Sequence, residues 1–309
     1  MTIAPPEAAL ARETGKTYPI PVVSALDFGS DPGEFYHLHA AHPVIVRDCF
    51  PAGHPLMDLN LDVIENLIGN IPIHVYGAAA ESFREVPAKA VFEGVRGIGE
   101  PYNVVDFYLT GTTLGRMFDV PPFLRQNWFL QPPANQDRYE KSLILSPAGA
   151  FTSLHLDSYA MQGWMFLIAG HKSWTLYSPD CVSAAFHPVE RRFFDSRNDS
   201  LTDFPALPAC DRWQGDIGRG DLLYFPAGWI HEVATHEISC GVGGSVLNDY
   251  QIEAHMHWWL WERERNVEGS LDLKQVLENM PEHRFSSAVG KARAQAALQM
   301  CRIWESQQR

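Results

Sequence analysis

Two histidines and one aspartate are the residues of this chain with the clearest capacity for chemistry. His155 and Asp157 stand two positions apart in the segment FTSLHLD (151–157), and alternate residues of a β-strand point to the same face of a sheet. Their imidazole and carboxylate can therefore chelate one metal ion. The best candidate for a third ligand is His231 in GDLLYFPAGWIHEV (220–233), where Pro-Ala-Gly predicts a turn that presents the histidine.

Two histidines and one carboxylate with open coordination positions are typical of non-haem Fe(II) oxygenases. The His-x-Asp pair alone is a weak signal, because the chain contains 13 histidines. A hydrogen-bonded core histidine beside a turn carboxylate gives the same pattern. The context strengthens the metal interpretation, since a strand precedes the pair, Gly-x-Lys follows it at 170–172, and Gly-Asp-x-x-x-x-Pro-x-x-x-x-His ends at His231.

Short β-strands are the elements that must position these residues. Between about residues 125 and 250, short apolar runs alternate with Gly, Pro and Asp, which is typical of an antiparallel sandwich or barrel. The predicted strands are WFLQ (128–131), SLILS (142–146), FTSLHLD (151–157), GWMFLIA (163–169), SWTLYS (173–178), DLLYFP (221–226), HEVATHE (231–237) and GGSVLN (243–248). The stretch 180–215, rich in Arg, Phe, Asp and Pro, is predicted to be a loop inserted between two of these strands.

The segments on either side of the strands predict helices and a tail. Residues 1–17 are polar and are expected to form a flexible tail. Helices are predicted at 32–41 and 59–68, and a further short helix is predicted to begin at 105–109. In the C-terminal region, the apolar residues that fall at helical spacing on one stripe are Val289, Ala292, Ala296, Met300 and Ile303.

Composition narrows the class of protein. The chain has 309 residues, of which 46% are hydrophobic and 12% aromatic, so it is neither disordered nor fibrous and can form one large domain or two small ones. Its net charge of −13 disfavours nucleic acid or an anionic membrane as the main partner. Five widely spaced cysteines favour a reducing compartment. Without a signal-peptide pattern or a long apolar run, a soluble, cytoplasmic protein is expected.

Taken together, these motifs resemble those of the JmjC/cupin-type family of Fe(II)- and 2-oxoglutarate-dependent oxygenases. The matching segments are PVIVRDCF (43–50), TSLHLD (152–157), GHKSW (170–174), the strand and turn at 220–231, and Asn248. Several linked motifs in the right order are more specific than the ligand triplet alone. The resemblance implies a double-stranded β-helix, or jelly roll, with flanking helices. It places an oxygenase domain at 18–255, with a core at about 125–250, and a helical region at 256–309.

The resemblance also implies a role for each matching residue. The ligands of Fe(II) would be His155, Asp157 and His231. Lys172 would bind the distal carboxylate of 2-oxoglutarate, with the Thr152 hydroxyl as its partner. Dioxygen would be the second cosubstrate.

Charge supports the role of Lys172. Fe(II) with one aspartate carries a net positive charge that the 2-oxoglutarate dianion exceeds, so a buried lysine balances the remainder. Without the resemblance, a solvated turn lysine beside Gly170 is the simpler interpretation. Asn248 falls where a late-strand asparagine is common in the family and is the expected further contact with the cosubstrate; Gln162 and Tyr159 are alternatives.

The predicted reaction is hydroxylation of an unactivated carbon, with release of succinate and CO2. The substrate would be an amino acid, a peptide or protein side chain, or a natural-product intermediate, and neither nucleic acid nor membrane is expected as a partner. The resemblance further implies a homodimer formed through the C-terminal helices. Two alternatives stay open: a cupin of another class, acting as an isomerase or a cosubstrate-free dioxygenase, and a non-catalytic cupin binding module. Lys172 argues against the first, because such an enzyme needs no counter-charge for 2-oxoglutarate. The intact triad and Lys172 argue against the second, because a degenerate member would be expected to lack at least one of them.

Overall fold

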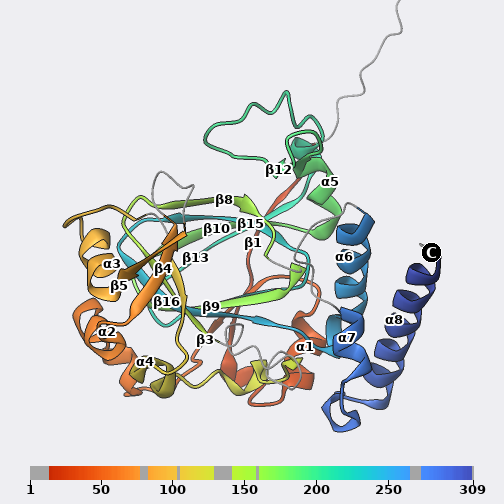
Figure 1. Ribbon diagram of the computed structural model, residues 1–309, viewed down its shortest axis with the longest axis horizontal. Coiled ribbons are helices and arrows are strands. Elements are labelled where there is room, and N and C mark those ends of the chain that lie inside the picture. Colours follow the sequence, from red (N-terminus) through yellow and green to blue (C-terminus); the bar gives the residue numbers. More distant parts are fainter. Residues whose placement is uncertain are drawn as a thin grey trace, which may run out of the picture.

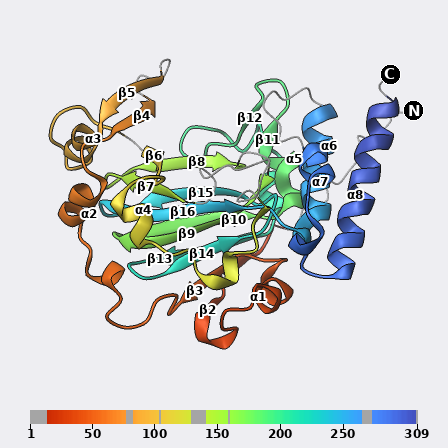
Figure 2. The ribbon, with the colours of Figure 1, turned by 60° about the horizontal axis from the view of Figure 1, so that its bottom comes forward.

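Two β-sheets that face each other form the centre of the computed structural model, which describes residues 14–76, 83–102, 105–128, 141–157, 160–264 and 273–307 (Figures 1 and 2). The five-stranded sheet has the order β1 (Thr17–Pro19), β13 (Arg212–Ile217), β10 (Lys172–Tyr177), β15 (Ile230–Thr235) and β8 (Phe151–His155). The seven-stranded sheet has the order β2 (Val22–Ser24), β3 (Val44–Arg47), β14 (Leu222–Phe225), β9 (Gln162–Ala169), β16 (Ser239–Val246), β7 (Ser142–Ser146) and β6 (Val105–Tyr108). The pairs β1/β13 and β2/β3 are parallel, and the other pairs in these sheets are antiparallel.

Strand β9 shows why the central strands read as continuous apolar runs. Its residue Leu167 faces the space between the sheets and packs in one cluster with Trp174 of the five-stranded sheet. The neighbouring residues Phe166 and Ile168 face the other way, into the core beneath the helices. Because both faces are covered by apolar layers, no polar alternation remains in the sequence.

The connectivity is consistent with a jelly roll. From β7 to β16 the chain crosses between the two sheets at nearly every step, since β7, β9, β14 and β16 lie in one sheet and β8, β10, β13 and β15 in the other. Within the described residues the sheets stay separate and form no closed barrel. The strands predicted from residue 142 onward are all present. The predicted strand WFLQ lies, apart from Trp128, outside the described residues.

The outer face of the seven-stranded sheet is covered by the N-terminal half of the chain. Its helices are α1 (Pro32–His39), α2 (Leu61–Ile68), α3 (Ala88–Val95) and α4 (Thr113–Met117), accompanied by the hairpin β4 (Pro72–Tyr76)–β5 (Phe83–Pro87). Apolar side chains from these helices, such as Phe35, Ile64 and Phe92, are fully buried in one cluster with the outward side chains of the sheet. Short 3-10 helices occur at Ala25–Asp27, Pro55–Asp58, Pro122–Leu124, Pro179–Cys181, Leu207–Ala209, Asp249–Gln251 and Glu282–Arg284.

The inserted stretch after β10 is shorter and more structured than predicted. It contains α5 (Val182–Ala185) and the two-residue strands β11 (Phe186–His187) and β12 (Arg192–Phe193), and it ends at Arg212, where β13 begins. Strand β13 was predicted as loop because its sequence RWQGDI is largely polar. It is held in the sheet by backbone pairing with β10 on one side and β1 on the other.

Two further predictions are corrected by the structure. The predicted helix at 105–109 is strand β6, in which Val105 and Phe107 are buried while Asp106 and Tyr108 face the other side. This alternation has the period of a strand, and β6 pairs with β7. The tail predicted at 1–17 is corrected at its end, because the Lys16 backbone N–H donates to Asp211 Oδ1 at 2.7 Å and β1 begins at Thr17. Residues 1–13 lie outside the described residues.

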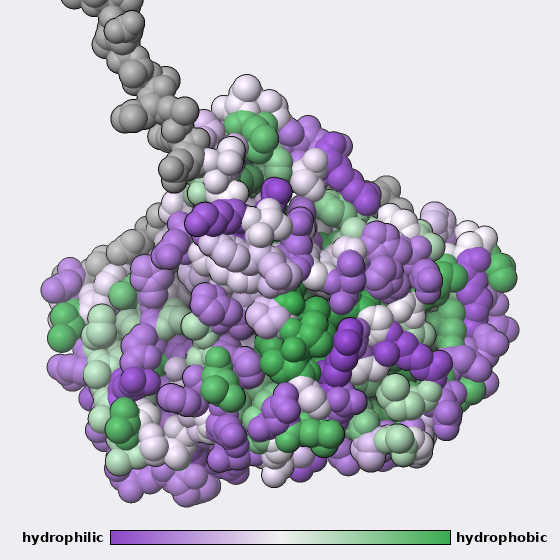
Figure 3. All heavy atoms as spheres, turned by 180° about the vertical axis from the view of Figure 1, so that it is seen from behind, coloured by the Kyte–Doolittle hydropathy of each residue, from purple (hydrophilic) through white to green (hydrophobic). Residues whose placement is uncertain are grey.

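Three C-terminal helices lie beside one end of the sheets: α6 (Ile252–Glu264), α7 (Leu273–Glu278) and α8 (Ala288–Gln307) (Figure 1). The buried residues of α8 are Gly290, Ala294, Ala297 and Cys301. The stripe noted in the sequence points the other way, and its large members Val289, Met300 and Ile303 are exposed. Seen from the side opposite to Figure 1, the surface is mainly hydrophilic, with smaller hydrophobic groups between (Figure 3). None of the described helices is both long and apolar enough to cross a membrane.

Candidate metal centre

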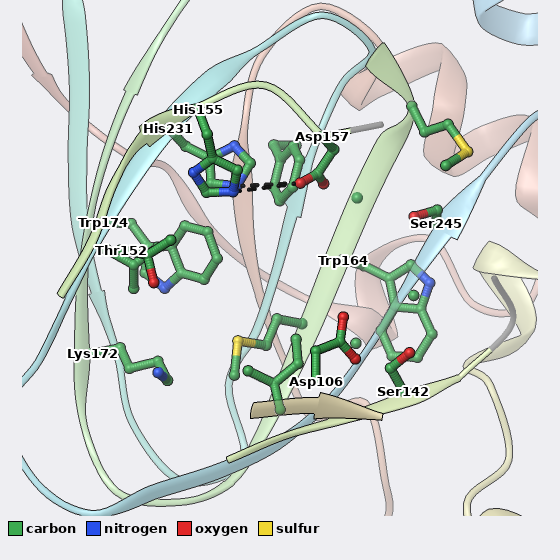
Figure 4. A pocket seen from close by; sticks show the side chains of 18 of the residues that line it. Asp106, Ser142, Thr152, His155, Asp157, Trp164, Lys172, Trp174, His231 and Ser245 are labelled. Carbon is green, nitrogen blue, oxygen red and sulfur yellow. Dashed lines mark ion pairs between the residues drawn. The ribbon is translucent and has the colours of Figure 1, made fainter. Parts of the chain in front are cut away.

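The predicted histidines and aspartate meet at one end of the five-stranded sheet. His155 is the last residue of β8, Asp157 follows two positions later, and His231 lies on β15 directly opposite His155 in the ladder. The Nε2 atoms of His155 and His231 lie 3.6 and 3.8 Å from Asp157 Oδ1. One ligand atom from each of the three residues lies within 4.8 Å of the others, which is close enough for the three to hold one metal ion (Figure 4).

A bulge in β8 brings a fourth predicted residue to the same side. His231 pairs with His155 and Val233 pairs with Thr152, so β8 has one residue more than β15 between these two pairs. In a regular strand, Thr152 and His155 would face opposite sides, because they are three positions apart. The extra residue turns both side chains into the same cavity.

The backbone fixes the orientation of both imidazoles. His155 Nδ1 lies 2.9 Å from the carbonyl oxygen of Ser153, and His231 Nδ1 lies 3.3 Å from that of Trp229. A carbonyl oxygen can only accept, so each Nδ1 carries a proton and each Nε2 faces Asp157. Both rings therefore direct to the cluster the nitrogen through which a metal ion would bind.

The pKa shifts of His231 and Asp157 favour metal binding, whereas the shift of His155 opposes it. Burial lowers the pKa of His231 to about 4, with a further contribution from His155. Burial alone raises the pKa of Asp157, but the two histidines outweigh it and the net shift is downward. For His155, burial lowers the pKa, but the Asp157 carboxylate outweighs it and the net shift is upward. At neutral pH, His231 is thus neutral and Asp157 ionised, as a metal ligand set requires.

The cluster lines a cavity of about 370 Å³ between the two sheets. We call the lining residues of β8, β10 and β15, together with Asp157, the ligand wall; besides the cluster they include Thr152, Lys172 and Trp174. The lining residues of β6, β7, β9 and β16 form the facing wall, which includes Asp106, Ser142, Gly163, Trp164 and Ser245. Figure 4 shows Asp106 and Ser142 on the far side of the cavity from His155 and His231.

Lys172 is the unusual member of the ligand wall. Its side chain is only 2% exposed, and its Nζ donates to Ser146 Oγ and Thr235 Oγ1, each at 2.9 Å. Burial lowers its pKa to about 8. Among the residues that the structure describes, no carboxylate forms an ion pair with it, so a buried ammonium faces the cavity with only two hydroxyl partners. The interpretation as a solvated turn lysine is excluded by this burial.

Asn248 takes a different place from the one its predicted role requires. It follows β16, is fully buried, and is not among the residues that line the cavity. Its Oδ1 accepts from Gln162 Nε2 at 3.1 Å and from the Tyr250 N–H at 3.2 Å, and its Nδ2 donates to the carbonyl oxygen of Gln126 at 3.1 Å. The other alternative, Tyr159, lies outside the described residues.

The hydroxyls that hold Lys172, and Asp106 on the facing wall, were missed in the sequence. Ser146 and Thr235 sit near the ends of their strands, and an isolated hydroxyl residue there carries no pattern. For Asp106 a signal did exist. The alternation of Val105 and Phe107 with polar residues predicts a strand that exposes Asp106 on one face.

The donor set fits a divalent first-row metal together with a dicarboxylate. Two oriented imidazoles and one carboxylate form the facial set that leaves positions open for other ligands. The unpaired ammonium of Lys172 lies in the same cavity, where an anionic group would compensate its charge. A cavity of about 370 Å³ can hold a small dicarboxylate and part of a second molecule.

Comparison with known proteins agrees with this chemistry. The cupin-like domain family matches residues 78–263, more than half of the chain, and the chain belongs to this JmjC-like cupin family. Similar curated proteins include the arginine-specific demethylase JMJ22 of Arabidopsis thaliana, 23% identical over 215 residues that make up 65% of this chain and 41% of that protein.

Two other similar proteins are named for related activities. The bifunctional arginine demethylase and lysyl-hydroxylase psr-1 of Caenorhabditis elegans is 22% identical over 179 residues, 55% of this chain and 44% of that protein. The lysine-specific demethylase 7B of Danio rerio is 22% identical over 234 residues, 72% of this chain and 40% of that protein. The matched regions therefore span less than half the length of each of these three relatives.

Proposed function

We propose that this protein is an Fe(II)- and 2-oxoglutarate-dependent oxygenase that hydroxylates an unactivated carbon. The observation that carries this proposal is Lys172, whose buried ammonium lines the same cavity as the His155, Asp157 and His231 cluster and forms no ion pair with any residue that the structure describes. A molecule with a carboxylate at each end can bind the metal at one end and Lys172 at the other. 2-Oxoglutarate has this form, and the family membership points to the same cosubstrate.

The residues of the ligand wall would have separate roles in binding the metal and the cosubstrate. His155, Asp157 and His231 would hold Fe(II), and Lys172 would orient the distal carboxylate beside the Thr152 hydroxyl. With 2-oxoglutarate, bound Fe(II) supplies the oxidative chemistry, in which O2 is consumed, the cosubstrate is decarboxylated to succinate and CO2, and one oxygen atom reaches the substrate.

Aromatic side chains pack against the buried histidine of the ligand wall. The rings of Phe225 and Trp174 pack 4.5 and 5.4 Å from the His231 ring, measured between centroids. Both side chains are buried. The apolar surroundings of His231 would strengthen its charge interaction with Asp157 and hold its ring in place.

The substrate we propose is a side chain of a peptide or protein. The names of the relatives describe demethylases and a lysyl-hydroxylase, which supports a peptide-sized substrate. An amino acid or a natural-product intermediate is the smaller alternative. Because the net charge is −13, we propose that neither nucleic acid nor a membrane is a partner. We also propose a cytoplasmic location. We further propose that the two sheets are the halves of a jelly roll.

The test is turnover of 2-oxoglutarate itself. Purified protein with Fe(II), ascorbate and O2 is expected to form succinate slowly even without substrate, because decarboxylation of the cosubstrate can run uncoupled. Asp157→Ala and Lys172→Met are expected to form none above background, whereas His257→Ala, a change on the exposed side of α6, keeps the wild-type rate. Folded, metal-loaded protein that forms no succinate would contradict the proposal and favour a cupin of another class.

The dimer implied by the resemblance is also a proposal. Helix α8 exposes Val289, Met300 and Ile303 on one stripe, and a second copy of this chain would cover them. Light scattering behind size exclusion is expected to give twice the chain mass for wild type and the chain mass for Met300→Asp. A wild-type monomer at micromolar concentration would contradict this assignment.

A further inference from the structure

Asp106 is a charged side chain of the cavity to which the proposed chemistry gives no role. It lies on β6, the last strand of the seven-stranded sheet, directly opposite Ile144 of β7. Asp106 and Tyr108 share the face that lines the cavity, while Val105 and Phe107 pack into the core behind. In Figure 4 the Asp106 carboxylate points into the cavity from the side opposite the metal ligands.

The surroundings of Asp106 leave its negative charge uncompensated. Burial raises its pKa to about 6; a hydrogen bond from Ser142 opposes this shift, and the negative charge of Asp157 adds to it. No Lys, Arg or His among the described residues forms an ion pair with it. Asp106 lines the cavity and its side chain is accessible to solvent, so a ligand can reach it.

A structural aspartate in the same protein shows the difference. Asp221 is held by two donors, the Arg47 Nε at 3.1 Å and the Gly218 N–H at 3.0 Å. These contacts fix a strand end in place and balance the charge. Asp106, by contrast, has one hydroxyl partner and points at empty space large enough for a ligand. It is also not one of the three residues that cluster around the metal position.

With Fe(II) and 2-oxoglutarate bound, the charges of the cavity would balance except for that of Asp106. The two positive charges of Fe(II) and the one of Lys172 are matched by Asp157 and the two carboxylates of 2-oxoglutarate. The ligand wall is then neutral. The negative charge of Asp106 is left over, and it faces the cavity from the side opposite the metal ligands.

We propose, on the basis of the function proposed above, that Asp106 is a specificity-determining residue that binds a cationic nitrogen group of the substrate, an ammonium or a guanidinium. The ring of Tyr108 completes this subsite, because Tyr108 is 51% exposed and lies two residues along the same face of β6. Aromatic faces attract cations, so the subsite combines one carboxylate with one ring.

The test measures recognition rather than turnover. The probes are Nα-acetyl-lysine N-methylamide, Nα-acetyl-arginine N-methylamide and the neutral Nα-acetyl-norleucine N-methylamide. Their dissociation constants are measured by ligand-observed NMR on the full chain. The protein is used metal-free and also loaded with Zn(II) and 2-oxoglutarate. The variants are Asp106→Asn, which keeps the shape and removes the charge, and Asp119→Asn, which removes the same charge at an exposed position outside the cavity.

We expect at least one cationic probe to bind wild type and Asp119→Asn about tenfold more tightly than the neutral probe, as one charge-assisted hydrogen bond provides. In Asp106→Asn this preference is lost, while the affinity for 2-oxoglutarate stays the same. The probe that binds more tightly, the lysine or the arginine derivative, shows whether the subsite prefers an ammonium or a guanidinium.

Two results would overturn the proposal: no preference for the cationic probes in wild type, or a preference that survives in Asp106→Asn. A gain in 2-oxoglutarate affinity in Asp106→Asn without any change for the probes would instead show that this carboxylate acts on the cosubstrate. Failure of the proposed function is seen separately, as absence of 2-oxoglutarate binding, because the metal-free arm reads the cation preference without any cosubstrate.

Discussion

The two walls of the cavity are built in opposite ways. On the ligand wall, the Nδ1 atoms of His155 and His231 are held by backbone carbonyls, and Lys172 is held by two hydroxyls from neighbouring strands. On the facing wall, strand β6 is the last of its sheet, and the charged side chain of Asp106 has one hydroxyl partner. Groups that hold a cofactor in fixed geometry need such support. A group that binds a substrate must instead keep its hydrogen-bonding capacity and charge free for that substrate.

A contact through Phe225 connects the two walls. The Phe225 ring packs 4.5 Å from His231 between centroids, and a Cβ added to Gly163 of β9 would lie 2.1 Å from Phe225 Cζ. The absence of a side chain at Gly163 therefore allows Phe225 to lie against the metal ligand. The facing wall thus contributes to the metal centre by leaving space for the Phe225 ring. Substitutions on the two walls are expected to differ in their effects.

Removing a metal ligand is expected to have the largest effect. His231→Ala deletes a preoriented imidazole, so the affinity for Co(II) should fall more than about 100-fold, beyond the loss typical for outer-sphere partners. Competition with a colorimetric chelator measures this affinity. His257→Ala on α6 is the control and keeps the wild-type value. Equal affinity in His231→Ala would show that this histidine is not a ligand.

Removing the charge of Lys172 is expected to affect the cosubstrate and the fold in opposite directions. Lys172→Met should weaken 2-oxoglutarate binding by about 100-fold or more, because the distal carboxylate loses its partner. The ligand-free protein should become more stable by roughly 1 kcal/mol, since a buried, unpaired ammonium is unfavourable. Calorimetry of binding and thermal unfolding report the two effects. A variant that loses stability and keeps cosubstrate affinity would contradict the account.

The same lysine predicts a pH dependence. Its pKa in the folded, ligand-free protein is lowered to about 8, so the charge that binds 2-oxoglutarate is present below that pH and is lost as the pH rises through it. With equal metal occupancy, the affinity at pH 9 should be about tenfold weaker than at pH 7. Lys172→Met should show no such change. A flat profile in wild type would exclude Lys172 as the titrating partner.

The link between the walls gives the smallest effect. Gly163→Ala forces Phe225 to move, and overpacking of this kind lowers the free energy of unfolding by about 1–3 kcal/mol. Because Phe225 rests on His231, the affinity for Co(II) should fall as well, but by less than in His231→Ala. Gly218→Ala is the control, because a Cβ there would meet only Asp221 Oδ2, at 3.9 Å. Unchanged metal affinity together with reduced stability would show that the walls act independently.

The sequence predicted the ligand wall better than the facing wall, for a physical reason. The side-chain period of a strand places His155 and Asp157 together, and a Pro-Ala-Gly turn marks His231. The bulge that adds Thr152 to the same face depends on pairing with β15, which one strand's sequence does not contain. Strand β6 was predicted as a helix because only four residues carry its alternation, and Asp106 was missed with it.

The C-terminal region shows a second limit of the sequence. The spacing of Val289, Met300 and Ile303 correctly indicates one face of a helix, but periodicity alone does not say what that face meets. In the structure, α8 packs through small residues instead. Gly290 lies so close to the sheet end that a Cβ there would be 1.8 Å from Asp249 Oδ2. Small residues at a close helix contact carry little hydrophobic signal, so the larger apolar stripe was noticed first.

The most direct test of the central claim is an anaerobic titration of the protein with Fe(II) and 2-oxoglutarate, monitored in the visible range. Chelation of Fe(II) by the keto and carboxylate oxygens of 2-oxoglutarate produces a metal-to-ligand charge-transfer band. We predict that wild type develops this band with saturation at one equivalent and that His155→Ala does not. A folded, metal-loaded wild-type protein that develops no band would contradict the assignment of 2-oxoglutarate and, with it, the proposed oxygenase.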